Sequence, residues 1–188
     1  ISWFAKGGIC LSDIRVAIVG IGNCASALVQ GVEYYKNVAE GEKVPGLMHV
    51  NFGGYHIRDI KFVAAFEVNK RKIGRDLSEA ISIEPNCCAK FAEVPNLNVK
   101  VLASPILDGV APHMREPFYA YDEKGMKPAN VAEVLKEAEA DVLVNFLPVG
   151  SYKATCYYAQ AAIDAGCALA NCIPEFIASD NPWSKKFE

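Results

Sequence analysis

The chain has 188 residues, 52% of them apolar and 22% charged, with a formal net charge of −3. This length suffices for one sizeable core, the composition is that of a globular protein, and the charge gives no basis for a nucleic-acid partner. No apolar run reaches the ~20 residues of a membrane-spanning helix. Seven cysteines and three histidines, without metal-ligand spacing, predict reduced thiols in a cytoplasmic protein and no metal site.

Both ends of the chain suggest a piece of a longer protein. Residues 1–11 have neither an initiator methionine nor a signal-peptide pattern, so we expect a non-native or disordered extension. The chain stops at Glu188 within a segment of helical pattern. We therefore expect residues 12–188 to form one domain that is incomplete.

The residue pattern at the start of this domain predicts a strand followed by a helix. Ile14–Val19 is a short, β-branched run that ends at Gly20, which is typical of a parallel strand buried on both faces. Asn23–Tyr35 carries apolar residues at helical spacing. Strand, glycine turn and helix form the context that a phosphate-binding loop requires.

The same alternation continues to the end of the chain. The pattern predicts strands over residues 60–66, 99–103, 141–146 and 168–173, and helices over 70–81, 130–138, 151–165 and from Pro182 onward. Strands alternating with helices predict an α/β fold, a Rossmann-like doubly wound parallel sheet with helices on both faces. The irregular segments 40–59 and 104–128 are both expected near the carboxyl edge of the sheet, where ligands bind.

The turn from Gly20 to Ala25 is the first candidate site. Gly20 permits a tight turn, Gly22 would let the backbone approach a pyrophosphate, and Ala25 allows close helix–strand packing. The free N–H groups at the helix start would face the anion. We interpret Cys24 as a small packing residue, and the histidines as loop or surface residues without a nucleophile–base pairing.

The acidic partner of this turn is Glu67, at the end of the second strand. It could accept hydrogen bonds from the ribose hydroxyls and repel a 2′-phosphate, which favours NAD over NADP. It lies much further from the turn than the usual ~20 residues, because the irregular segment intervenes. Lys70, Arg71 and Lys72 could hold a 2′-phosphate, but we interpret them as a solvated helix face.

The end of the fourth strand, Asn145 to Ser151, is the second candidate site. Pro148 and Gly150 could turn the backbone towards the cofactor, and Ser151 could cap the next helix. A plain strand-to-helix connection explains the same residues equally well. Asn171, at the end of the fifth strand, occupies the same topological place.

These residues resemble one family, the compact bacterial and archaeal inositol-1-phosphate synthases (myo-inositol-3-phosphate synthases). The resemblance is specific, because the irregular segment before the second strand matches as well as the general parts of the fold. The matching strings are residues 14–35, 44–59, 60–79, 107–109, 141–151 and 173–187.

The resemblance implies an isomerase of inositol and phospholipid biosynthesis, acting in the cytoplasm as a homotetramer. Such enzymes convert glucose 6-phosphate by oxidation at C5 with NAD, closure of an enolate onto C1, and return of the hydride. The catalytic lysines and most of the substrate site would lie beyond Glu188. The catalytic residues of this chain therefore stay unknown, and we expect it to be inactive alone.

The same resemblance, with the strand ends above, gives the expected NAD-binding residues. They are Gly20, Ile21, Gly22, Asn23, Cys24, Ala25, Glu67, Asp108, Asn145, Leu147, Pro148, Val149, Ser151 and Asn171. Two alternatives stay open: another NAD(P)-dependent dehydrogenase, or a non-catalytic NAD-sensing domain.

Overall fold

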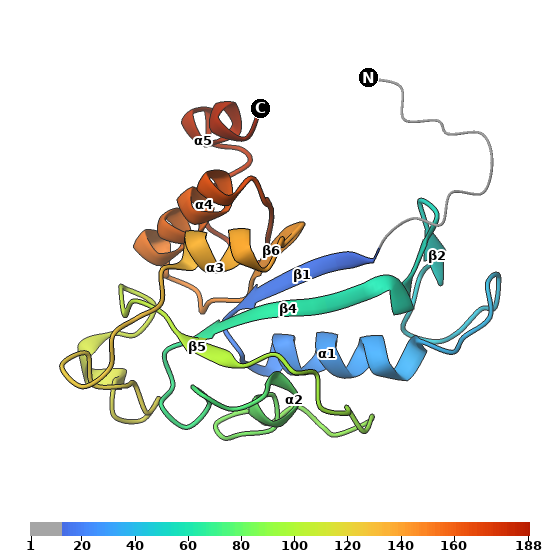
Figure 1. The fold of residues 1–188 in the computed structure, drawn as a ribbon, viewed down its shortest axis with the longest axis horizontal. Coiled ribbons are helices and arrows are strands. Elements are labelled where there is room, and N and C mark those ends of the chain that lie inside the picture. Colours follow the sequence, from blue (N-terminus) through green and yellow to red (C-terminus); the bar gives the residue numbers. More distant parts are fainter. Residues whose placement is uncertain (1–12) are drawn as a thin grey trace.

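The computed structural model describes residues 13–188, so the extension expected at residues 1–11 lies outside the described residues. Five parallel strands form one sheet in the order β5-β4-β1-β6-β7 (Figure 1). Chain connections diverge on either side of β1, which makes its carboxyl end a topological switch point. This order confirms the predicted doubly wound α/β fold. The strands are β1 (Ile14–Val19), β4 (Ile60–Glu67), β5 (Val101–Ala103), β6 (Val142–Asn145) and β7 (Ala168–Asn171).

Helices cover both faces of the sheet. α1 and α2 lie on one face, and α3 and α4 lie on the other (Figure 1). Successive side chains of a strand point to opposite faces of the sheet, so β1 contributes to two cores. Val16 and Ile18 belong to one core, and Ala17 and Val19 belong to the other. Apart from Arg15 near its amino end, the strand is apolar, since both its faces are buried. The helices are α1 (Asn23–Tyr35), α2 (Leu77–Ala80), α3 (Val131–Glu137), α4 (Tyr152–Ala165) and α5 (Asn181–Phe187).

Most predicted elements are confirmed, and the largest difference is in α2. The helix predicted over residues 70–81 is a single short helix, because residues 70–75 form turns that include Gly74 at φ +85°. Asp76 then starts the helix by accepting a hydrogen bond from the Ser78 N–H. The strand predicted over 168–173 ends at Asn171, and the one over 99–103 begins at Val101.

The irregular segment 40–59 lies at the opposite edge from the one predicted. It follows the C-terminal end of α1, which has returned to the amino edge of the sheet, and it contains the hairpin β2 (Asn51–Phe52) and β3 (Tyr55–His56) (Figure 1). His56 is not a surface residue as predicted. Its side chain is buried, and Nε2 lies 2.8 Å from the Val38 carbonyl oxygen.

Three findings concern residues 13–188 only. No helix in this range has the length and apolar character needed to cross a membrane. The six cysteines in it are free thiols. Its histidine, cysteine and acidic side chains nowhere gather in threes as metal ligands would.

Candidate functional site

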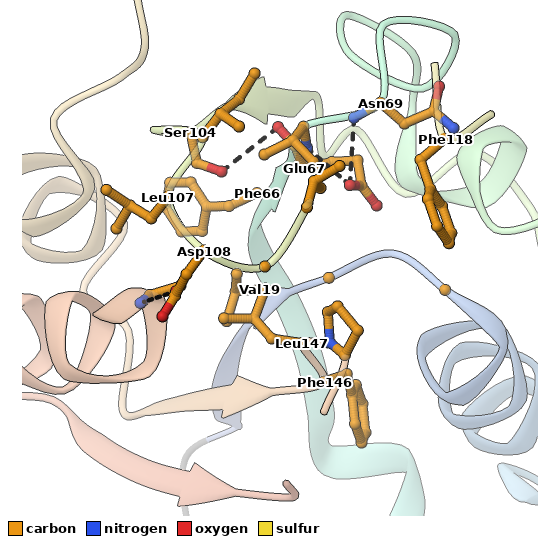
Figure 2. A pocket seen from close by; sticks show the side chains of 18 of the residues that line it. Val19, Phe66, Glu67, Asn69, Ser104, Leu107, Asp108, Phe118, Phe146 and Leu147 are labelled. Atoms are coloured by element: carbon orange, nitrogen blue, oxygen red, sulfur yellow. Dashed lines mark hydrogen bonds between the residues drawn. The ribbon is translucent and has the colours of Figure 1, made fainter. Parts of the chain in front are cut away.

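A cavity of about 470 Å³ opens at the carboxyl edge of the sheet, around the ends of β1, β4 and β6 (Figure 2). Its walls are the glycine turn, the end of β4 from Glu67 to Asn69, the segment 104–111 and the residues that follow β6. This volume and this position at a switch point are typical of small-molecule and cofactor sites. The segment 104–128 therefore leaves from the edge predicted for it.

The two glycines of the turn are required for different reasons. Gly20 has φ +84°, and a Cβ there would lie 2.8 Å from the Phe146 carbonyl oxygen, so a side chain is excluded on both counts. Gly22 is the N-cap of α1, and nothing lies within 4 Å of the position of its missing Cβ. The packing role predicted for Ala25 is observed, since this residue is fully buried in the core. Gly22 thus leaves open space at the start of the helix.

The start of α1 keeps its backbone donors available. Ile21 N donates to Glu67 Oε2 at 2.9 Å, but within residues 13–188 no group accepts a hydrogen bond from the N–H of Gly22, Asn23 or Cys24. Free N–H groups and the positive end of the helix dipole favour an anion here. Cys24 is exposed rather than packed as predicted, because it begins the outer face of α1.

Glu67 joins the end of β4 to the glycine turn. Besides the Ile21 N–H, its carboxylate accepts hydrogen bonds from Val68 N at 2.7 Å and Asn69 N at 3.3 Å. Glu67 also lines the cavity, where Figure 2 shows its carboxylate on the same side as Phe118. The acid therefore has a fixed position beside the start of α1.

Lys72 is not on a solvated helix face as predicted. It is 2% exposed, and its Nζ donates to the Ile21 carbonyl oxygen at 2.6 Å and to Asn86 Oδ1 at 2.7 Å. Burial lowers the pKa of Lys72, and the Glu67 carboxylate partly offsets this effect. The prediction fails because residues 70–75 form turns, which direct Lys72 inward while Lys70 stays exposed.

The polar residues around the end of β6 mostly serve the fold. Asn145 is buried, and its Nδ2 donates to Thr155 Oγ1 at 3.2 Å and to Asn171 Oδ1 at 2.9 Å. Ser151 does not cap α4 with its side chain as predicted, because its hydroxyl donates back to the Pro148 carbonyl oxygen. These side chains hold the strand ends in place.

Asp108 occupies the N-terminus of α4. Its two carboxylate oxygens accept hydrogen bonds from Lys153 N at 2.6 Å and Ala154 N at 2.9 Å. A carboxylate at a helix start satisfies free N–H groups and the helix dipole. The cap comes from 45 residues away along the chain, so no local pattern could have predicted it.

The structure brings half of the predicted site residues to the cavity wall. Those lining it are Gly20, Gly22, Glu67, Asp108, Leu147, Pro148 and Val149. Those outside the lining are Ile21, Asn23, Cys24, Ala25, Asn145, Ser151 and Asn171. Sequence reasoning missed Lys72 and the apolar wall of the cavity. The signal for that wall was the apolar character of an irregular segment that leaves the carboxyl edge, and its members are Ile106, Leu107, Val110, Met114 and Phe118.

The strand order, glycine turn and edge cavity define the class of the protein as a Rossmann-like α/β domain. No protein-family model matches the chain. Curated relatives named inositol-3-phosphate synthase are 55% identical in Corynebacterium glutamicum and 56% in Mycolicibacterium smegmatis, over 94% of this chain and 48% of each relative. A relative with the same name in Mycobacterium tuberculosis is 54% identical over 94% of this chain and 47% of its own length.

Two crystal structures are similar in fold. Ari2 superposes with a TM-score of 0.77 at 33% identity, covering 94% of this chain and 51% of that protein. A myo-inositol-1-phosphate synthase-related protein from Thermotoga maritima gives a TM-score of 0.64 at 24% identity, over 93% of this chain and 51% of the other. The second likeness concerns the fold alone.

Over the part of those proteins that it spans, the chain is similar to inositol-3-phosphate synthases, which confirms the predicted resemblance. It spans about half the length of the curated relatives that it matches.

Proposed function

We propose that this domain binds NAD for an inositol-3-phosphate synthase, with the dinucleotide across the carboxyl ends of β1, β4 and β6. The observation that carries the proposal is the start of α1, where open space at Gly22 and backbone N–H groups without an acceptor in residues 13–188 lie beside the Glu67 carboxylate. A pyrophosphate needs N–H donors and close backbone approach, and a ribose needs a carboxylate acceptor. The residues present fit both requirements.

The residues of this chain would orient the dinucleotide and exclude water. The N–H groups at the start of α1 would hold the pyrophosphate, and Glu67 the adenosine ribose. The apolar residues Leu147, Pro148 and Val149 follow β6 on the cavity wall, where they would cover the other half of the ligand. Bound NAD would supply a hydride acceptor that is restored within each turnover.

The whole protein would then convert glucose 6-phosphate to inositol 3-phosphate with no net oxidation. We propose that the whole protein is a homotetramer in the cytoplasm. Free thiols such as those of this chain stay reduced in that compartment. With the purified whole protein, glucose 6-phosphate should disappear only when NAD is present, and NADH absorbance should not accumulate. Stoichiometric NADH release would instead indicate an ordinary NAD-dependent dehydrogenase.

Binding by this domain is tested through Glu67. Calorimetric titration should give tighter binding of NAD than of NADP, because the carboxylate repels a 2′-phosphate. Glu67→Ala should weaken NAD binding at least about tenfold, which corresponds to ~1.4 kcal/mol for a lost charged hydrogen-bond acceptor. Glu93→Ala is the matched control, since that carboxylate is 87% exposed and pairs only with Lys90 among the described residues. Equal NAD affinity in the two variants would exclude this placement of the ribose.

A further inference from the structure

A buried ammonium group lies directly beneath the glycine turn. Lys72 Nζ is 2.6 Å from the Ile21 carbonyl oxygen, and two covalent bonds separate that oxygen from the Gly22 nitrogen. The ammonium therefore lies within about 5 Å of the first free N–H at the start of α1. Asn86 supports it from the other side through Oδ1, while Asn86 Nδ2 donates to the same Ile21 oxygen at 3.1 Å.

Two features indicate a role for the charge beyond that of the hydrogen bond. An amide side chain could donate to the Ile21 oxygen without the large cost of burying an ammonium group. Two of the three ammonium donors of Lys72 are used by Ile21 and Asn86, and Lys72 is also part of the cavity wall. The positive charge of Lys72 is therefore available to attract an anionic ligand at the start of α1.

The charges around the turn match an adenosine phosphate in kind and in position. Glu67 and Lys72 bind the two backbone polar groups of the same residue: Glu67 accepts a hydrogen bond from Ile21 N, and Lys72 donates one to Ile21 O. A ribose presents hydroxyl donors, for which a carboxylate is the complement, and a phosphate presents anionic oxygens, for which an ammonium is the complement. Lys70 and Arg71 are exposed and provide no such buried charge.

We propose that Lys72 is the cation of this phosphate-binding turn, a binding residue that stabilises the pyrophosphate through its charge while its hydrogen bond fixes the Ile21 peptide. The proposal rests on the proposed function, because it concerns the anionic part of the same dinucleotide. It predicts that affinity for phosphate-bearing ligands depends on Lys72, and that affinity for the uncharged nucleoside does not.

The test compares ADP with adenosine as probes, titrated into the purified protein. Lys72→Met should weaken ADP binding by about tenfold to fiftyfold, the size expected for a charge about 7 Å from a phosphate in a partly buried site. Adenosine affinity should change less than about twofold. Lys72→Gln should behave like Lys72→Met, since it retains a donor but not the charge. Lys70→Met, which removes the same charge from the exposed side of the segment, should leave both affinities unchanged.

Several outcomes would overturn the proposal. Equal losses for ADP and adenosine in Lys72→Met would show a purely structural role, and restored ADP binding in Lys72→Gln would show that the hydrogen bond alone matters. Should Lys72→Met fail to fold, Asn86→Asp takes its place, because a carboxylate there would neutralise Lys72; ADP affinity should again fall more than adenosine affinity. A wild-type protein that binds neither NAD nor ADP would refute the proposed function itself.

Discussion

Two helices begin at the same edge of the sheet, one on each side of the switch point, and their N-termini differ. α1 starts at Gly22 with no side-chain cap and with open space around it. α4 starts under the carboxylate of Asp108, which already binds the N–H groups of Lys153 and Ala154. Both helix starts have the dipole and donors that attract anions, but only α1 leaves them for a ligand. Of these two helix starts, the chain's own carboxylate occupies the one at α4.

The turn at Gly20 gives the largest expected effect. Gly20→Ala should lower the free energy of unfolding by about 2–4 kcal/mol, since it combines a left-handed backbone with a Cβ 2.8 Å from the Phe146 carbonyl oxygen. NAD binding should be lost with the turn. Chemical denaturation measures the first effect and calorimetry the second. Gly31→Ala, inside α1 with nothing within 4 Å of the new methyl group, should instead stabilise by about 0.5–1 kcal/mol. If Gly20→Ala left the free energy of unfolding unchanged, the turn after β1 and the backbone after β6 would not be in contact.

A third helix start, that of α2, supplies the next largest effect. Asp76 accepts hydrogen bonds from the N–H groups of Ser78, Leu97 and Val99. Burial alone would raise the pKa of Asp76, but hydrogen bonds from the Ser78 hydroxyl and from these N–H groups outweigh burial and lower it. Asp76→Ala should cost about 2 kcal/mol, the upper part of the range for an N-cap, because the carboxylate also holds residues 97–99.

The same shift fixes the pH dependence of stability. The folded protein binds fewer protons than the unfolded chain between the lowered pKa of Asp76 and its ordinary value of 3.8. The contribution of Asp76 is therefore fully present above pH 3.8 and is lost as the pH falls through the lowered pKa. Acid unfolding should be measured for wild type and for Asp76→Asn. The fall in the free energy of unfolding that Asp76 causes in this pH range should be present in wild type and absent from the variant. Identical slopes would exclude the charged cap.

Removal of the carboxylate from α4 should have a smaller effect. Asp108→Ala should cost about 1 kcal/mol, as for other N-caps, and should speed amide exchange at Lys153 and Ala154. Asp164→Ala, at the other end of α4, serves as the control and should leave those two amides protected. Unchanged exchange in Asp108→Ala would show that the two helix starts do not differ in the way described.

The smallest effect on stability should accompany a clear effect on binding. Gly22→Ala meets nothing within 4 Å, and its φ of −91° suits alanine, so the free energy of unfolding should change by only a few tenths of a kcal/mol. The new methyl group would occupy the open space proposed for the pyrophosphate, so NAD affinity should fall about tenfold or more in a calorimetric titration. A Gly22→Ala variant that binds NAD like wild type would place the phosphates elsewhere.

Much of the fold could be predicted, because its signals are local. The apolar run of β1 and the helical spacing of α1 were predicted with the observed ends. α2 was predicted too long, since helical spacing over residues 70–81 does not reveal the turn around Gly74. The buried Lys72 follows from the same turn, and so it too was missed.

The candidate site could be predicted most directly where a backbone feature defines it. The glycine turn is such a feature, because a left-handed φ and close packing restrict Gly20 to glycine whatever surrounds it. The side chains of Asn145, Ser151 and Asn171 have polar groups that suit a ligand equally well, yet they bind one another or nearby backbone. Whether a polar side chain faces a ligand or binds its neighbours depends on residues that are close in space but distant in the sequence.

The sequence by itself determined the order of strands and helices, the turn at Gly20 and the acid at Glu67, since periodicity and backbone restriction act over a few residues. Only the tertiary structure decided which helix start stays free. Asp108 reaches α4 and Lys72 reaches Ile21 across separations of 45 and 51 residues. Contacts of this kind form when parallel strands align their carboxyl ends at one edge, which is a property of the assembled sheet.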